Sequence, residues 1–137
     1  MIRPIERAIS IYRRIIGESA YYCDPSNWKD VSKIYFTGND GFIAILGDCR
    51  TKINIWMIVY NKTFVLRLLM NELAKDSFGN KLYILNIKNR SENSIISART
   101  SDWFRTMGLI PVYHRDGQIS IEFDSNLLRE KFIFDTS

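Results

Sequence analysis

Apolar side chains recur every three or four residues over positions 4–16, a spacing typical of an amphipathic helix. Gly17 follows this segment and supplies a left-handed stop. Asp24 and Pro25 then have the residue types of a helix cap and a first helical position. The sequence therefore predicts a long first helix and a short second one, whose tail KIYF fits either helix or strand.

Continuous apolar runs farther along predict buried strands, because they are too short for a membrane span and are bounded by turn residues. The predicted strands are residues 42–47, 52–60 and 81–88, followed by two more on either side of Asp116-Gly117. Two helices lie between them, one from a cap at Thr63 to Gly79 and one from residue 95 to Gly108. The dipeptide Asp116-Gly117 is a strong hairpin signal.

This alternation of helices and strands predicts the fold class. We expect an α/β (α+β) protein with a mixed, mostly antiparallel central sheet of six to seven strands and helices on both faces. With 137 residues and no linker-like tract, residues 1–137 should form a single domain.

Charge and composition exclude little and point to an ordinary soluble protein. The formal charge of +4 permits a nucleic-acid groove, with Arg3, Arg7, Arg13 and Arg14 along the first helix, but a solvated helix face explains these arginines equally well. Cys23 and Cys49 stand alone, without metal-binding spacing. No apolar run approaches the roughly 20 residues of a membrane span, and the N-terminus lacks the apolar core of a signal peptide, so we expect a cytoplasmic protein.

Three stretches resemble the acyl-CoA N-acyltransferase fold, the GNAT superfamily. WFRTMGL, at 103–109, sits where that superfamily has LYEKLGF, a helix end followed by a strand. DGFIAILG resembles its dGkivGfi strand, and MIRP is a common way for such chains to begin. These stretches follow one another in the superfamily's order along nearly the whole chain.

A narrower similarity is to the internal virion protein A family of short-tailed coliphages, itself of GNAT-like build. The shared residues are Gly41, Phe42, Ala44, Gly47, Cys49, Thr106, Gly108, Arg115, Asp116, Gly117 and Gln118. The resemblance implies a phage protein of GNAT-like architecture, although turns alone demand several of these glycines and aspartates.

The GNAT resemblance implies a coenzyme site whose parts are altered here. The superfamily binds the pyrophosphate with a glycine-rich loop between a strand and the following helix, and the equivalent span IVYNKTFVLRLLMNEL contains no glycine. If an acyl-CoA is bound, the implied contacts are Val59, Asn61, Lys62 and Phe104. Phe104 occupies the position of the tyrosine that protonates the leaving thiolate, and a phenyl ring cannot donate a proton.

A general base is equally hard to find in the sequence. The strand at 52–60 contains no acid, and the remaining candidates are Asp40 and Asp48 in turns, Glu72 on a helix and the single histidine, His114. Tyr113 or Ser101 could replace the missing hydroxyl only in a different geometry. We therefore assign no catalytic residue and no metal ligand from the sequence.

Three functions remain open at this point. The first is a GNAT-like phage protein that has lost catalysis, needs no cofactor and acts through contacts with an unidentified phage or host protein in virion morphogenesis or host takeover. Its contact surface would include Tyr21, Tyr22, Trp28 and Trp103, unless these rings pack in the core. The second is a divergent N-acetyltransferase that uses acetyl-CoA. The third, less favoured, is a basic nucleic-acid-binding module.

Overall fold

The computed structural model describes residues 2–47, 51–77, 79–88 and 98–133. The helices are α1 (Ile2–Ile15), the 3-10 turn η1 (Pro25–Trp28), α2 (Thr63–Lys75), α3 (Ala98–Thr106) and α4 (Ser125–Phe132). The strands are β1 (Val31–Thr37), β2 (Gly41–Leu46), β3 (Lys52–Tyr60), β4 (Leu82–Lys88), β5 (Pro111–Tyr113) and β6 (Ile119–Asp124).

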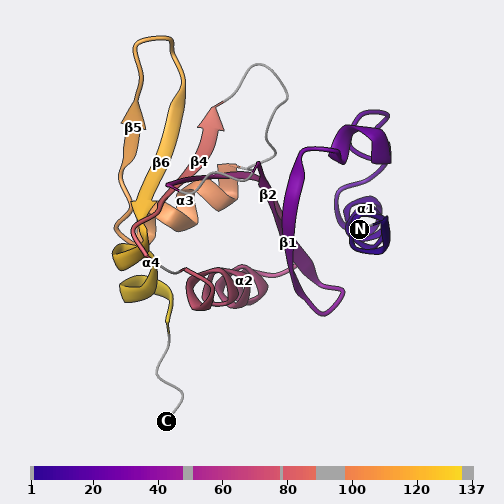
Figure 1. Cartoon of the computed structure of the whole chain (residues 1–137), viewed down its shortest axis with the longest axis horizontal. Coiled ribbons are helices and arrows are strands. Elements are labelled where there is room, and N and C mark those ends of the chain that lie inside the picture. The colour runs from indigo at the N-terminus through magenta and orange to yellow at the C-terminus, as the bar shows by residue number, and fades with distance from the viewer. Residues whose placement is uncertain (1, 48–50, 78, 89–97, 134–137) are drawn as a thin grey trace.

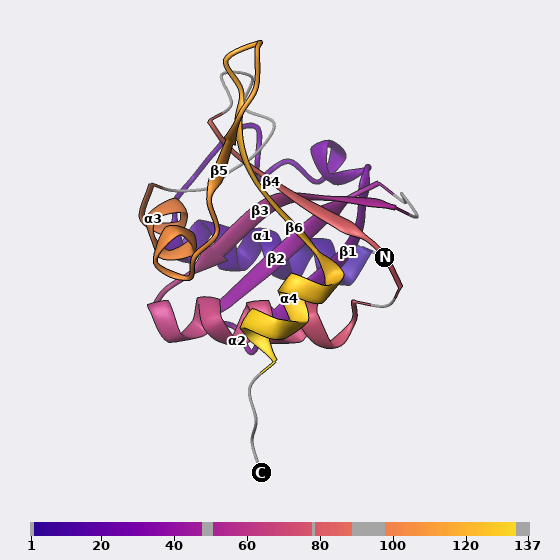
Figure 2. The ribbon, with the colours of Figure 1, turned by 90° about the vertical axis from the view of Figure 1, so that its left-hand side faces the viewer.

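The described strands form one six-stranded mixed sheet in the order β1-β2-β3-β4-β6-β5. Every neighbouring pair is antiparallel except β3 and β4, which run parallel and are connected through α2. The predicted α+β class, with a mostly antiparallel sheet, is confirmed. Figure 2 shows the β5–β6 hairpin extending beyond the rest of the sheet.

Helices pack on both faces of the sheet, as predicted, and each face has its own apolar cluster. Figure 1 shows α1 on one side of β1 and α2 on the other. On the α1 face, Trp28 and Tyr12 pack with Phe42 and Trp56. On the opposite face, the apolar sides of α2, α3 and α4 pack on β3, β4 and β6, and Leu69 and Phe104 are fully buried there.

Several element boundaries differ from the predictions. The short second helix is a single 3-10 turn, capped by Asp24 as expected, and the ambiguous KIYF segment lies in β1. The prediction that Thr63 caps α2 was wrong: Lys62 is the cap residue, α2 ends at Lys75, and Thr63 lies in the first turn. Helix α4 was not predicted, although the Asp124 side chain caps it by accepting a hydrogen bond from the Leu127 N–H.

The parallel pair β3 and β4 is joined over only part of its length. Lys52–Ile55 pair with Leu82–Leu85, but β3 continues to Tyr60 and β4 to Lys88. Beyond this point β3 still pairs with β2, and β4 still pairs with β6. The two halves of the sheet therefore part at the carboxyl ends of β3 and β4.

Two local features shape β3 where it leaves β4. Trp56 is an extra residue opposite the step from Ala44 to Ile45, which is the geometry of a β-bulge. Gly41, opposite Tyr60, has no room for a side chain, because an added Cβ would lie 2.6 Å from the Val59 carbonyl oxygen and 2.9 Å from Val65 Cγ1. The glycine thus lets α2 pack closely against the end of β3.

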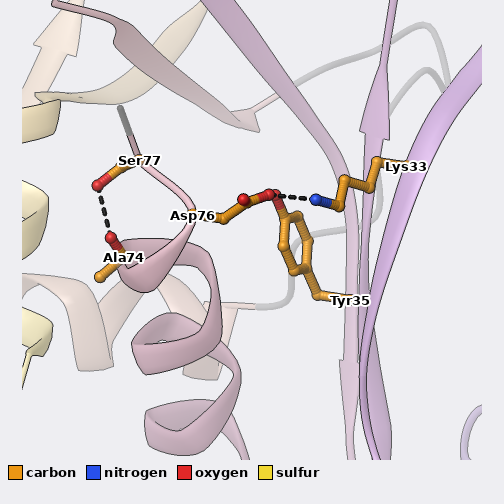
Figure 3. A network of polar contacts seen from close by, with 5 residues as sticks. All are labelled: Lys33, Tyr35, Ala74, Asp76 and Ser77. Atoms are coloured by element: carbon orange, nitrogen blue, oxygen red, sulfur yellow. Dashed lines mark hydrogen bonds and ion pairs between the residues drawn. The ribbon is translucent and has the colours of Figure 1, made fainter. Parts of the chain in front are cut away.

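A polar cluster connects the end of α2 to β1 (Figure 3). The Asp76 carboxylate accepts hydrogen bonds from the Lys33 ammonium group and, at 2.5 Å, from the Tyr35 hydroxyl. These bonds, first that from Lys33, hold the pKa of Asp76 below its usual value. Burial and the contact with Asp76 raise the pKa of Tyr35.

We expect Asp76→Asn to lower the free energy of unfolding by about 1 kcal/mol at pH 7. The effect is modest because the Lys33 and Asp76 side chains are 52% and 36% exposed, so solvent screens their attraction. Since the folded-state pKa is lowered, the contribution is present above about pH 4 and disappears as pH falls through the folded-state value. Urea unfolding at several pH values measures it.

Glu72→Gln is the matched control, because Glu72 is an exposed acid on the same helix whose ion pair with Lys75 is a surface contact. It should change stability by less than about 0.5 kcal/mol. A stability difference between the parent protein and Asp76→Asn that stays constant from pH 7 to pH 3 would contradict this account.

Candidate functional site

A cleft of about 650 Å³ lies along the end of β3, beyond its last pairing with β4. Its floor is the end of β3 with the residue that follows, and its walls come from the C-terminus of α1 and the N-terminus of α3. The lining residues are Arg14, Ile15, Ile16, Ile58, Val59, Tyr60, Asn61 and Arg99. In α/β sheets, ligands commonly bind beyond the carboxyl ends of parallel strands, and the cleft has that location.

Arg99 and Tyr60 form the polar wall of the cleft on the α3 side. The Arg99 guanidinium donates a hydrogen bond of 2.9 Å to the Thr63 hydroxyl and lies 5.6 Å from the centre of the Tyr60 ring. The Tyr60 hydroxyl is 2.9 Å from the Thr100 hydroxyl. These contacts hold an exposed cation beside the first turn of α2.

The start of α2 adjoins the cleft and is electropositive. Among the described residues, none caps this helix with a side-chain hydrogen bond, and the exposed cap residue is Lys62. The positive end of the helix dipole therefore lies close to Lys62 and Arg99, an arrangement that favours anions. The Asp40 carboxylate lies nearby, where it accepts a hydrogen bond of 2.9 Å from the side-chain amide of Asn61. Its negative charge reduces this positive field.

A second hollow, of about 550 Å³, lies over β3, β4 and β6 and takes in the β5–β6 turn. We call it the basin. Its lining includes Asn54 and Trp56 of β3, Asn86 of β4, and His114 and Glu122 from the hairpin. The basin adjoins the cleft along β3, since Ile58 lines the cleft and Trp56 lines the basin.

His114, Ser120 and Glu122 form a hydrogen-bonded chain in the basin. The Ser120 hydroxyl donates to Glu122 Oε2 at 3.0 Å, and His114 Nε2 lies 2.8 Å from the same hydroxyl. Because the serine proton points to the carboxylate, its oxygen accepts from His114, which requires a proton on Nε2. His114 Nε2 is also 3.5 Å from Glu122 Oε2. Ser120 is 1% exposed, so a ligand would reach Glu122 and His114 instead.

The sequence-predicted coenzyme contacts do not all lie at the cleft. Val59 and Asn61 line it, and Lys62 adjoins it at the start of α2. Phe104 is fully buried and packs against Trp103, Phe123 and Phe132. A ligand in the cleft therefore cannot contact Phe104 in this arrangement.

The candidate bases and acids are widely separated. Glu72 forms a surface ion pair with Lys75, and Asp48 lies outside the described residues. His114 is exposed in the segment between β5 and β6 and lines the basin. Tyr113 is 71% exposed and Ser101 is buried in α3.

Most of the arginines and aromatic rings considered from the sequence contact other residues of the protein. Arg7 lies over the Phe36 ring, Arg13 pairs with Glu18, and Arg14 lines the cleft. Trp28 and Tyr22 are buried, whereas Trp103 is partly buried against the core. Tyr21, 41% exposed, is the most accessible of the four rings considered.

Sequence reasoning missed Arg14 and Arg99 as cleft residues and Ser120 and Glu122 as basin residues. The alternation Ser120, Ile121, Glu122, Phe123 does indicate a strand with one polar face. However, only the pairing of Ser120 with Val112 places that face beside His114. The missing information was the register of the hairpin.

Comparisons with protein-family models, with curated proteins and with solved structures find no match to this chain. None of the helices in the described part of the chain is long and apolar enough to cross a membrane. Within the described ranges, no three His, Cys, Asp or Glu side chains gather in a way that could hold a metal ion.

We expect His114 to be protonated on Nε2 when it is neutral, because Ser120 Oγ accepts that proton. His114 is the single histidine of the chain, so its ring signals in two-dimensional ¹H–¹⁵N NMR need no assignment. Ser120→Ala should remove the preference and give a mixture of tautomers. Observing the Nδ1–H tautomer in the parent protein at pH 8 would contradict the hydrogen-bonded chain.

Proposed function

We propose that this protein is a GNAT-like N-acyltransferase that holds an acyl-CoA in the cleft and an amine in the basin. The observation that carries the proposal is the parting of β3 and β4 after Ile55 and Leu85. Among the described residues, it leaves an opening between the two halves of the sheet, with Arg14 and Arg99 in its walls and the basin alongside. The three stretches that resemble the GNAT superfamily in the sequence also support the proposal.

The coenzyme's phosphates fit the electropositive end of the cleft. The glycine-rich loop of the GNAT pattern is absent, and Arg99 and Lys62 supply charge in its place. Arginine binds phosphate through paired, charge-assisted hydrogen bonds, so these side chains compensate for a less open backbone. A hydrogen bond to the Thr63 hydroxyl already holds the Arg99 side chain beside α2. Because of this, Arg99 loses less side-chain entropy when it binds a phosphate.

Glu122 is the residue best placed to accept the amine's proton. In the transfer, the amine nitrogen forms a bond to the thioester carbonyl carbon, and the carbon–sulfur bond breaks. The nitrogen's proton passes to Glu122, directly or through a water molecule in the basin, while Ser120 and His114 hold the carboxylate. Because Phe104 is buried and carries no hydroxyl, the departing thiolate takes its proton from solvent.

A second candidate is the phage protein without catalysis, which acts in the cytoplasm of an infected cell. Phe104 favours it, because the acid of the GNAT pattern is replaced by a core phenyl ring. Exposed apolar side chains on and beside the edge strand β5 also favour it, with Ile110 79% and Tyr113 71% exposed. Such residues at a sheet edge are typical of a protein-contact surface.

We expect acetyl-CoA to raise the melting temperature of the parent protein, because binding to the folded state stabilises it by about 2.7 kcal/mol at 100 times Kd. Arg99→Ala should weaken the affinity at least about tenfold, the value of one charge-assisted hydrogen bond. Arg115→Ala, at the exposed hairpin turn, should have no effect. The absence of any shift at millimolar acetyl-CoA would remove the acyltransferase proposal.

We expect Glu122→Gln to lower acyl transfer at least about 100-fold while leaving the affinity for acetyl-CoA unchanged. Release of free thiol, with polyamines and lysine peptides as acceptors, measures transfer. Glu130→Gln on the exposed side of α4 is the control and should retain full activity. Coenzyme binding without transfer to any amine tested would favour the second candidate.

A further inference from the structure

The two faces of the sheet contribute different chemistry to the cleft. On the face covered by α2 and α3, the cleft is bounded by Arg99 and by the Tyr60 hydroxyl. On the α1 face, its wall is the last turn of α1 and the residue beyond it, Ile15 and Ile16. A ligand that passes through the opening therefore meets Arg99 and Tyr60 on one side, and Ile15 and Ile16 beside Arg14 on the other.

The apolar wall includes one side chain that the packing of α1 leaves exposed. Ile15 is partly buried against the α1-face cluster, whereas Ile16 is 53% exposed. Leaving a large aliphatic side chain exposed next to Arg14, at the mouth of a cleft, gives the mostly apolar lining with a few charged groups that small-molecule sites have.

We propose that the acyl group carried in this cleft is an aliphatic chain longer than acetyl, held against Ile15 and Ile16. The inference rests on the proposed function, since it names the acyl class of the same site. An acetyl group has one methyl carbon beyond the carbonyl and cannot cover this wall. A longer aliphatic chain, attached at the far end of the pantetheine arm from the phosphates, supplies the apolar surface that can cover Ile16 while the phosphates remain near Arg99.

Chain-length dependence of binding tests this proposal directly. Isothermal titration with coenzyme A, acetyl-CoA and octanoyl-CoA compares ligands that share the same head group. We expect octanoyl-CoA to bind the parent protein at least about tenfold more tightly than acetyl-CoA, equivalent to about 1.4 kcal/mol. Partial burial of the additional methylene groups accounts for a difference of this size.

Ile16→Asn locates the chain without changing the charge of the cleft. It should remove the advantage of octanoyl-CoA, so that the ratio of the affinities for octanoyl-CoA and acetyl-CoA falls to about one. Ile110→Asn is the matched control, because Ile110 is an exposed isoleucine at the β5 end of the sheet, and it should keep the full advantage. Circular dichroism confirms that both variants are folded.

The outcomes separate this inference from the function on which it rests. Equal affinities of the parent protein for acetyl-CoA and octanoyl-CoA would overturn the chain-length proposal and leave coenzyme binding intact. An advantage for octanoyl-CoA that survives Ile16→Asn, or that Ile110→Asn abolishes equally, would also overturn it. Failure of all three ligands to bind would overturn both the acyl class and the proposed function.

Discussion

The incomplete pairing of β3 with β4 is the constraint on which the other features of this protein depend. Parallel strands require a crossover, and α2 supplies it, beginning within three residues of the end of β3. Beyond Ile55 and Leu85, β3 remains paired with β2 and β4 remains paired with β6. The sheet therefore separates into two halves, each of which keeps its own strand pairing. The opening, the start of α2 and the ends of α1 and α3 consequently meet at one place.

Close packing around β3 maintains this geometry. Because Gly41 has no side chain, β2 lies close both to the Val59 carbonyl oxygen of β3 and to Val65 in the first turn of α2. The bulge at Trp56 lets both Trp56 and Met57 join the cluster under α1, while Ile55 and Ile58 pack on the α2 side. The end of β3 is thus anchored on both faces, even though no strand in the described part of the chain pairs with its β4-side edge. A rigid floor of this kind lowers the entropic cost of holding an extended ligand.

Most of the fold could be predicted from the sequence, because periodicity and turn residues act locally. Helix α4 was missed because β6 runs into it without a glycine or proline, although Asp124 and the spacing of Leu128 and Phe132 are both visible. The site was harder to predict. Phe104 was correctly placed near the end of a helix, but only packing shows that it faces the core. Glu122 becomes a partner of His114 only through strand register.

The central claim is that the end of β3, beyond its described pairing with β4, is a ligand-binding surface. Backbone ¹H–¹⁵N NMR of the protein during titration with coenzyme A tests it most directly, because every amide of β3 reports separately. The account predicts the largest shifts at residues 57–61 and at the start of α2, with residues of β1 unchanged. Shifts confined to other regions, or none at saturating concentration, would contradict it.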